Sequence, residues 1–360
     1  MSSTGGAPAA AEAEGEREAL KIVLDTLGGD NPPQEIVQGG LLAGKALGVN
    51  ILFAGDESVI QPLLPARDER FSILHAPEVV SMEDTPAEAV RRKKNSSLVQ
   101  GIRVVRHGQA DAFVSPANTG AVMAASLFGL GRISGIERPG IGVSLPTILG
   151  GQVLVIDVGA NTDCSAENLL QFAIMGRVYA REVLGISEPR LALVNIGSEW
   201  HKGNELVKQA RSYLEGFPGF IGNIEPNRLF HGEVDVAVCD GFVGNILLKA
   251  AEGGVEVTIA ALKNALTSSA LSKVGTLLCK PALRRFKDEI NRAAFGGAPL
   301  LGVRGITIIA HGDSNAEAIK NAIRVACEAV QHDLVGRIES RVHEHLEQNE
   351  RRGQSEQGAG

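Results

Sequence analysis

Aromatic side chains are scarce in this sequence, and neither sign of charge dominates it. Phe, Trp and Tyr make up 4% of the 360 residues, with one Trp and two Tyr, and 35 Lys and Arg face 42 Asp and Glu, a net charge of −7. A nucleic-acid-binding protein would carry a basic face and aromatic rings for base stacking. The composition therefore argues against nucleic acid as a partner.

Cysteines are few and scattered. Cys164, Cys239, Cys279 and Cys327 lie far apart, without a CxxC motif or a Cys/His cluster, so neither a structural zinc site nor a disulfide framework is indicated. The HExxH motif and other dense ligand sets are also missing, and we expect no metal site. The cysteine usage is typical of a reducing, cytoplasmic environment.

Long hydrophobic runs are missing as well. No apolar stretch approaches the roughly 18 uncharged residues of a membrane span, and the N-terminus lacks the basic and then apolar pattern of a signal peptide. The ends, residues 1–20 and 347–360, are polar and without apolar periodicity, which predicts disordered tails. The apolar fraction of 44% is high enough for a buried core, so we expect one folded domain over residues 21–346.

The sequence does contain an alternation of short β-branched runs and longer stretches of helical period. The strand-like runs are Lys21–Leu27, Asn50–Ala54, Ser72–His75, Ala112–Ser115, Val153–Val158, Leu191–Ile196, Val234–Cys239 and Ile306–Ala310. The helical stretches include Glu35–Leu47, Glu88–Arg106, Thr119–Leu130, Glu167–Leu184 and Asn204–Leu214. This alternation predicts an α/β fold with a mostly parallel sheet, helices on both faces and ligand sites beyond the carboxyl ends of the strands.

Gly- and Asn-rich loops follow six of these strands. They comprise residues 28–33, 116–120, 159–163, 197–205, 240–245 and 311–315. Ordinary strand-to-helix turns contain the same residue types, but six such loops converging on one edge of a sheet favour a shared polar site. Because glycine-rich backbone that opens onto a helix N-terminus presents free N–H groups, we expect a phosphate or a phosphorylated ligand.

Sequence motifs narrow the chemistry further. There is no GxxxxGK[ST] or GxSxG motif, and residues 129–134 imitate GxGxxG but have Ser134 at the third glycine. Cys164 and Cys239 are interpreted as small buried hydrophobic residues rather than nucleophiles. We therefore favour direct attack by a bound anion, with Lys202 and Asn245 as the side chains that stabilise the developing negative charge.

Two basic segments stand out on an otherwise acidic chain. Residues 260–287 contain six Lys or Arg and no acidic residue, and residues 91–97 form a basic run in a predicted helix. The first segment suits either a helical hairpin packed in a subunit interface or docking on an anionic membrane surface or an acidic carrier protein. The second suits either a solvated face or an anion or carrier contact. The contact candidates are Arg91, Arg92, Lys93, Lys273, Lys280, Arg284 and Arg285.

Nine short segments, spread over about residues 21–336, carry a family resemblance. In chain order they are Leu24–Asp30, Ala89–Ser97, Asn118–Gly120, Asp157–Asn161, Leu170–Gly176, Lys202–Leu206, Phe220–Glu225, Asp240–Asn245 and Ala310–Gly312. Together they resemble the acyl-carrier-protein:phosphate acyltransferases of bacterial phospholipid synthesis. Pro116 and Ala117 depart from the small flexible pair usual in that family, and acyl-chain preference is the property that this departure affects most.

The resemblance implies a three-layer α/β/α sandwich of the phosphotransacetylase and isocitrate-dehydrogenase type, as a homodimer with its catalytic domain in residues 21–346. It implies transfer of a long-chain acyl group from acyl carrier protein to inorganic phosphate, without a metal or a cofactor. A membrane glycerol-3-phosphate acyltransferase would use the acyl phosphate downstream. Peripheral association with an anionic membrane surface would suit that role.

The resemblance also suggests a mechanism. Lys202 and the loop amides near Gly28 and Gly120 would hold phosphate while it attacks the thioester carbonyl. Asn245 would stabilise the oxyanion that forms, and His311 is a candidate acid or base.

Further polar residues of the loops complete the predicted site. Three strand-end carboxylates would orient Lys202 or accept a phosphate proton, or would only cap loops: Asp25, Asp157 and Asp240. The other predicted substrate contacts are Gly29, Asp30, Asn118, Thr119, Asn161, Asn204, Gly241 and Gly244.

Two other functions stay open at this point. One is an NAD(P)-dependent decarboxylating dehydrogenase of similar architecture, which would need carboxylates around a divalent metal. The candidates for such carboxylates are Asp30, Asp157, Asp163 and Asp240. The other is a non-catalytic adaptor for a carrier protein or lipid surface, which would use residues 260–287 alone and leave six polar loops without a role.

Overall fold

The computed structural model describes residues 19–30, 32–81, 83–294 and 296–357. Its strands are β1 (Lys21–Asp25), β2 (Asn50–Gly55), β3 (Phe71–His75), β4 (Ala112–Ser115), β5 (Gly140–Pro146), β6 (Gln152–Ile156), β7 (Leu191–Val194), β8 (Phe220–Ile224), β9 (Val236–Val238), β10 (Ala298–Leu301) and β11 (Ile306–Ile309). Its α-helices are α1 (Gln34–Leu47), α2 (Glu57–Ile60), α3 (Pro86–Arg92), α4 (Ser97–Arg106), α5 (Thr119–Gly129), α6 (Ala166–Glu182), α7 (Glu205–Leu214), α8 (Gly241–Thr267), α9 (Ala270–Ala294), α10 (Ala316–Gln331) and α11 (Leu334–Gln357). Two short 3-10 helices are η1 (Gln61–Leu63) and η2 (Pro226–His231).

The strands of the described residues form one 11-stranded sheet, in the order β3-β2-β1-β4-β11-β10-β5-β6-β9-β7-β8. The pairs β11–β10, β10–β5 and β5–β6 are antiparallel, and the other pairs are parallel. The sheet is therefore mostly parallel, as predicted. However, β6, β9, β7 and β8 run opposite to β3, β2, β1, β4 and β11. The prediction that the six loops leave the sheet at one edge is wrong, because β10 and β5 reverse the direction of half of the sheet, but residues of five of these loops still line one cavity.

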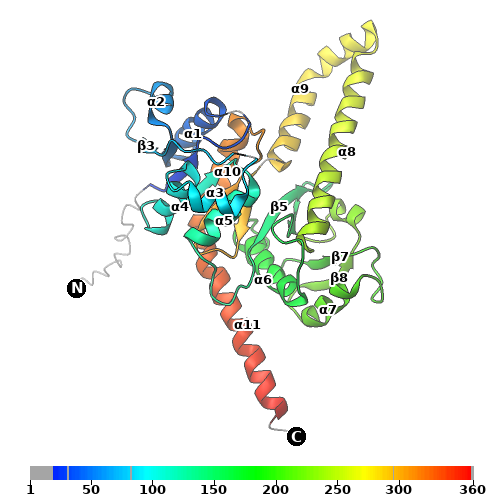
Figure 1. The fold of residues 1–360 in the computed structure, drawn as a ribbon. Coiled ribbons are helices and arrows are strands. Elements are labelled where there is room, and N and C mark those ends of the chain that lie inside the picture. The colour runs from blue at the N-terminus through cyan, green and yellow to red at the C-terminus, as the bar shows by residue number, and fades with distance from the viewer. Residues whose placement is uncertain (1–18, 31, 82, 295, 358–360) are drawn as a thin grey trace, which may run out of the picture.

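Helices cover both faces of the sheet, which gives three layers (Figure 1). In β1, Ile22 and Leu24 pack into a core that they share with α1, α6 and α10, whereas Val23 belongs to the opposite face, where α4 and α5 pack. This alternation follows from the two-residue period of a strand. Because both faces are buried, β1 has the continuous apolar sequence that made it recognisable as a strand.

Three strands lack the pattern that identified the others. β5, β8 and β10 have the sequences GIGVSLP, FIGNI and APLL, in which Gly or Pro interrupts the apolar run. Glycine and proline are both depleted in strands, so these segments carried no strand prediction. Two of them, β5 and β10, are the strands that reverse the sheet.

Two helix boundaries also differ from the sequence prediction. The helix predicted over residues 88–106 is two helices, α3 and α4, because Ser96 caps α4 by accepting a hydrogen bond from the Val99 N–H at 3.3 Å. Residues 347–357, predicted as disordered, continue α11, since Glu, Gln and Arg favour helix. Residues 1–18 and 358–360 of the predicted tails lie outside the described residues.

α8 and α9 form an arm that projects from the body of the molecule (Figure 1). Residues 260–287, the basic segment, lie in this arm. Leu271 and Leu278 are 82% and 78% exposed, and Lys273 and Lys280 are exposed beside them. The side chains of Arg284 and Arg285 lie outside the described residues. The arm therefore presents apolar and basic side chains together.

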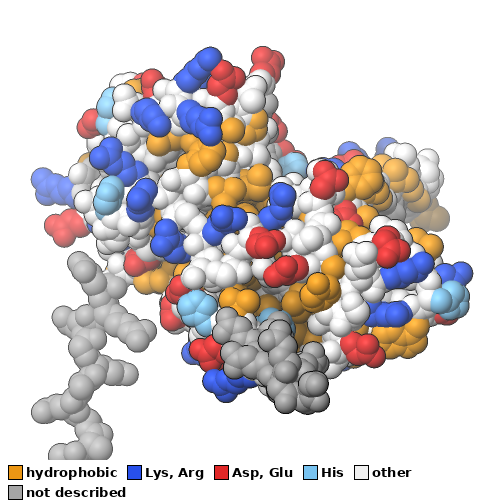
Figure 2. All heavy atoms as spheres, turned by 60° about the horizontal axis from the view of Figure 1, so that its bottom comes forward, with side chains coloured by type: hydrophobic (Ala, Val, Ile, Leu, Met, Phe, Trp, Pro, Cys, Tyr) orange, Lys and Arg blue, Asp and Glu red, His pale blue; other side chains and the backbone are white. Residues whose placement is uncertain are grey.

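Charges of both signs are interspersed over the face shown in Figure 2, and hydrophobic side chains lie between them in smaller patches. On this face, the net negative charge of the chain is not gathered in one region. Among the described residues, no helix is long and apolar enough to span a membrane.

Candidate functional site

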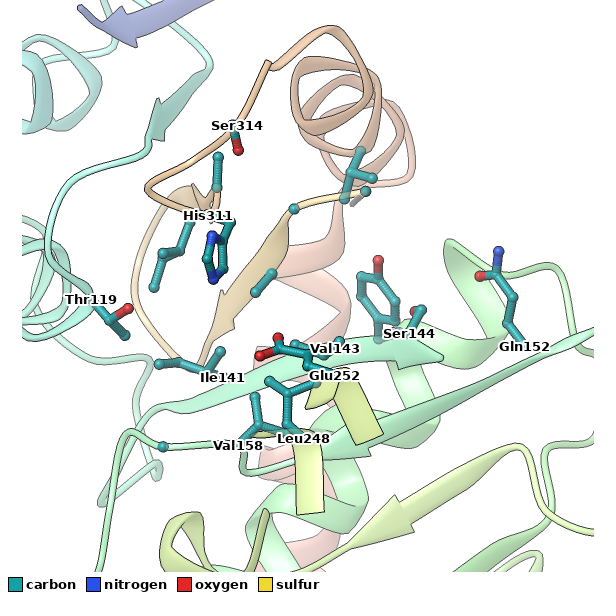
Figure 3. A pocket seen from close by; sticks show the side chains of 18 of the residues that line it. Thr119, Ile141, Val143, Ser144, Gln152, Val158, Leu248, Glu252, His311 and Ser314 are labelled. Atoms are coloured by element: carbon teal, nitrogen blue, oxygen red, sulfur yellow. The ribbon is translucent and has the colours of Figure 1, made fainter. Parts of the chain in front are cut away.

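A cavity of about 930 Å³ opens between two groups of loops. One wall comes from the loops that follow β1, β4 and β11, and the other comes from the loop after β6 and the first turns of α8. In Figure 3, Thr119 and His311 lie across the cavity from Val158 and Leu248. Six residues of the predicted site line the cavity: Asp30, Asn118, Thr119, Gly120, Asn245 and His311.

The sheet supplies an apolar floor to the cavity. Ile141 and Val143 of β5, Ala298 of β10 and Ile309 of β11 all line it. Ile141 and Val143 are two residues apart and therefore point to the same face of the strand. The cavity combines this hydrocarbon surface with polar loop residues, which suits a ligand that has both an apolar and an anionic part.

Glycines hold the first group of loops together. A Cβ on Gly28 would lie 2.7 Å from the Ala117 nitrogen, and one on Gly29 (φ +80°) would lie 2.7 Å from the Gly312 oxygen. The Asp30 N–H donates to the same Gly312 oxygen at 2.7 Å. No side chain fits at either glycine. Gly28 and Gly29 therefore position the loops and do not line the cavity themselves.

Asp25 lies beneath these loops and is buried. Its carboxylate accepts hydrogen bonds from the Ser115 hydroxyl at 2.7 Å and from the Leu27 N–H at 3.1 Å. Burial raises the pKa of Asp25, although these hydrogen bonds act in the opposite direction. Since Asp25 is 1% exposed, it positions the loops after β1 and β4 without touching a ligand.

Asp157 plays the matching part in the second group of loops. Its carboxylate accepts hydrogen bonds from the backbone N–H groups of Ile141, Gly159, Ala160 and Asn161, at 2.7 to 3.2 Å. The Asn161 side-chain amide donates to Asp157 at 2.9 Å and to the Pro139 oxygen at 2.7 Å. Burial raises the pKa of Asp157. Asp157 and Asn161 thus shape the loop after β6.

The start of α8 is locked onto that loop. Asp240 caps the helix by accepting a hydrogen bond from the Val243 N–H at 2.9 Å. A Cβ on Gly241 would lie 2.6 Å from the Asn161 oxygen, and one on Gly244 would collide with the Asp157 oxygen. This close approach places Asn245 against Gly159 at the cavity wall. Asp240, Gly241 and Gly244 therefore position Asn245.

The N-terminus of α5 faces the cavity from the opposite wall. Asn118 caps this helix by accepting a hydrogen bond from the Ala121 N–H at 3.2 Å. Thr119 and Gly120 form its first turn and line the cavity. The positive end of the helix dipole and the N–H groups of that turn make this the part of the cavity best suited to an anion.

His311 follows β11 and lines the same cavity as the first turn of α5. Its Nδ1 lies 2.6 Å from Asp313 Oδ1. A carboxylate accepts only, so Nδ1 carries the proton and Nε2 is left as an acceptor, or as a second donor when the ring is charged. The longer contact from the Asp313 N–H to Nδ1, at 3.4 Å, is too weak to reverse this. His311 is therefore equipped to move a proton at Nε2.

Lys202 and Asn204 lie apart from the other predicted site residues. Both are exposed in the loop between β7 and α7, where Asn204 caps α7 through the Val207 N–H at 2.9 Å. Lys202 is not among the described residues that line the cavity. Both residues follow β7, which lies two strands beyond β6 in the order of the sheet, whereas the loop that lines the cavity follows β6 itself.

One wall of the cavity was not predicted from the sequence. Leu248, Lys249 and Glu252 line it together with Asn245, and Lys249 pairs with Glu252 at 2.8 Å. Residues 245, 248 and 252 follow the three- and four-residue spacing of one helical face. This signal was present in the sequence, but it required α8 to be recognised as a helix.

The cysteines near the site are poor nucleophiles. Burial, with the nearby Asp157 charge, raises the pKa of Cys164 to about 11, and burial raises the pKa of Cys239 well above its usual range. Both therefore stay protonated at neutral pH. Separately, the described residues contain no group of three or more His, Cys, Asp or Glu side chains that could hold a metal ion.

The predicted contact residues of the 91–97 segment differ in their surroundings. Arg91 lies over the Phe128 ring, 5.1 Å from its centroid, and Arg92 pairs with Glu88 at 2.5 Å. Both are exposed. Lys93 is half-buried, and its Nζ lies 2.5 Å from Asp84 and donates to the Val79 oxygen at 2.8 Å. Lys93 is therefore tied into its own loop.

Comparison with known proteins gives concordant results. The family described as "Fatty acid synthesis protein" matches residues 20–337. A phosphate acyltransferase of Pelotomaculum thermopropionicum is 50% identical over 326 residues, which cover 90% of this chain and 95% of that protein. A phosphate acyltransferase of Heliobacterium modesticaldum is 49% identical over 328 residues, with 90% and 98% covered.

A solved structure supports the fold independently. A phosphotransacetylase from Streptococcus pyogenes is similar with a TM-score of 0.58 at 15% sequence identity, over 87% of this chain and 94% of that chain. Identity this low shows a common fold and no more. The predicted α/β fold of phosphotransacetylase type is confirmed.

Proposed function

The chain belongs to the phosphate acyltransferase family of fatty acid synthesis proteins and is an enzyme of that kind, and we propose that it transfers a long-chain acyl group from acyl carrier protein to inorganic phosphate. The product is an acyl phosphate, which a membrane glycerol-3-phosphate acyltransferase consumes downstream. This family membership leaves no support for the dehydrogenase or the non-catalytic adaptor.

The observation that carries the proposal is that an anion-binding type of surface and an apolar surface line the same cavity. The first turn of α5 offers N–H groups and a helix dipole to phosphate. Ile141 and Val143 of the sheet floor offer an apolar surface to the acyl chain. A phosphate oxygen and a thioester carbonyl bound on these surfaces are held close together, which lowers the entropic cost of their reaction.

The proposed reaction is a direct displacement. A phosphate oxygen attacks the thioester carbonyl carbon, and the carbonyl oxygen gains negative charge that the Asn245 amide N–H stabilises. The carbon–sulfur bond then breaks and the carrier thiolate leaves. His311 accepts the phosphate proton at Nε2 and passes it to the thiolate. The protonated thiols of Cys164 and Cys239 favour this route over a covalent acyl-enzyme.

Lys202 stays in the proposal as the cation that neutralises phosphate during approach. Because it does not line the cavity within one chain, this role requires either movement of the β7–α7 loop or a second copy of the chain. The proposed homodimer would supply such a copy.

Contacts with larger partners are also proposed. Arg91 and Arg92 are exposed on α3, which suits an acidic carrier protein. On the arm, Lys273 and Lys280 accompany exposed leucines, which suits a second subunit or an anionic membrane surface. Co-sedimentation of the protein with anionic vesicles, set beside its mass in solution, separates these two partners. Leu278→Asp should weaken whichever contact exists.

The transferase activity has a direct test. The purified protein is incubated with palmitoyl-acyl carrier protein, with and without inorganic phosphate, while free carrier thiol is followed and acyl phosphate is trapped with hydroxylamine. Phosphate-dependent thiol release with a trapped product is expected. His311→Gln should slow it, whereas His231→Gln, a control on exposed η2, should not. Absence of release with several chain lengths, from folded protein, would contradict the proposal.

A further inference from the structure

Four arginines gather between α6 and α11, outside the catalytic cavity. Arg177 and Arg181 come from α6, and Arg337 and Arg341 come from α11. Together with Glu182 and Glu344 they line a separate small cavity of about 90 Å³. This volume is roughly three times that of a water molecule in the liquid, so it suits a single small ionic group.

Arg177 is incompletely satisfied at this cavity. Its side chain is 15% exposed, and its Nε is one of two buried side-chain polar atoms in the described residues that have no hydrogen-bond partner. Among the described residues, its only ion pair is with Glu188. That pair is long, at 3.5 Å, and Glu188 is 82% exposed. A buried guanidinium nitrogen without an acceptor is costly. Arg177 therefore lies at the cavity with a buried nitrogen that lacks an acceptor.

The charges around the cavity favour an anion. Arg337 pairs with Glu182 at 3.2 Å and Arg341 with Glu344 at 2.5 Å, but Arg181 has no ion pair among the described residues. Burial lowers the pKa of Arg177, and the positive charges of Arg181 and Arg341 lower it further. The two α6 arginines thus carry positive charge that the neighbouring glutamates do not balance.

We propose that this cluster is a second oxyanion site, which binds one phosphate-type group between α6 and α11. The planar guanidinium groups donate in the fork geometry that matches a tetrahedral oxyanion. The bound group accepts from the guanidinium groups of α6 and α11 and so bridges the two helices. The site is independent of the transferase reaction, since none of its residues lines the catalytic cavity.

Thermal unfolding of the full chain tests the site. Inorganic phosphate should raise the melting temperature relative to sodium chloride of equal ionic strength, by about 2 °C at tenfold excess over the dissociation constant. The Arg181→Gln, Arg341→Gln double variant should lose most of this shift. The control, Arg103→Gln with Arg106→Gln, makes the same charge change on α4 and should keep it. Phosphate bound in the catalytic cavity contributes equally to both variants, so their difference reports the new site.

A second variant gives a prediction of opposite sign. Glu182→Gln frees Arg337 from its ion pair and should enlarge the phosphate shift, which loss of packing alone would not do. If the double variant does not fold, Arg181→Gln alone takes its place. An equal phosphate shift in the arginine variant and its control, or a smaller shift in Glu182→Gln, would overturn the proposal.

The chemical source of the group is separated by two further probes. A response to phosphate and sulfate but not to methyl phosphate assigns a free inorganic oxyanion, and a response to methyl phosphate assigns the phosphate group of a larger molecule. Phosphate-dependent thiol release should persist in the arginine variants. A failure of this site is therefore distinguishable from a failure of the transferase.

Discussion

The loops at the large cavity and the loop between β7 and α7 look alike in sequence but are held differently. At the cavity, buried Asp25 and Asp157 accept hydrogen bonds from backbone N–H groups, and glycines let neighbouring loops touch. In the β7–α7 loop, Asn195 donates to the Lys202 carbonyl at 3.1 Å while the Lys202 side chain stays exposed. The two kinds of loop therefore differ in their charged side chains, because those of Asp25 and Asp157 are buried and hold the backbone, whereas that of Lys202 is exposed.

The largest effect is expected where the packing is tightest. Gly244→Ala puts a Cβ onto the Asp157 oxygen, so we expect a loss of about 3 kcal/mol of stability and of most activity. Urea unfolding measures the loss. Gly254→Ala on the same helix has nothing within 4 Å of its Cβ and should stabilise by about 0.5–1 kcal/mol. Equal stability of the two variants would contradict the tight packing of α8 against the loop after β6.

The next largest effect is expected on activity, at Asn245, which this packing positions. Asn245→Ala should lower kcat about 100-fold, because the oxyanion loses a donor, and should leave the melting temperature nearly unchanged because Asn245 is exposed. Steady-state kinetics with palmitoyl-acyl carrier protein measure the change. Asn264→Ala, also exposed on α8, is the control. A fall confined to phosphate KM would instead make Asn245 a phosphate ligand.

Lys202 tests the role of the exposed loop between β7 and α7. Lys202→Ala should lower activity tenfold to 100-fold, which is about 1.5–3 kcal/mol for a lost charged hydrogen bond, with no change in melting temperature. Near-normal rates would remove Lys202 from the mechanism.

Co-expression then asks which chain supplies Lys202. Dimers that combine Lys202→Ala with Asn245→Ala hold one intact site if Lys202 acts on the partner, and a random mixture should recover about a quarter of wild-type activity. No recovery would assign Lys202 to its own chain, reached through movement of the β7–α7 loop.

The smallest effect is a pH dependence of stability. Burial raises the pKa of Asp25 above 3.8, so the folded chain keeps this proton at a pH where the unfolded chain releases it. The stability that this adds is complete below pH 3.8 and is lost as pH rises through the raised folded pKa. Asp25→Asn should remove that decline from melting temperatures measured between about pH 4 and 7. Parallel curves for the two proteins would contradict it.

Much of this fold was readable from the sequence, because buried strands such as Ala112–Ser115 are short apolar runs with polar loops behind them. That pattern also predicts that Asn118 and His311, which follow two such strands, line the same cavity. It does not predict the place of Lys202, because that place depends on the order of the strands in the sheet, and the sequence pattern does not give that order. The lining role of Glu252 was hidden for a different reason, since it required the whole length of α8.

One feature of α8 connects distant parts of the molecule mechanically. The helix runs without interruption for 27 residues, which is about 40 Å. Its first turns carry Asn245 in the cavity wall, and its far end carries the tip of the arm. A helix of this length behaves as a stiff lever, so a tilt imposed at the tip turns the base as well. Under the proposed mechanism, a partner that binds the tip would therefore also shift the Asn245 amide at the cavity wall.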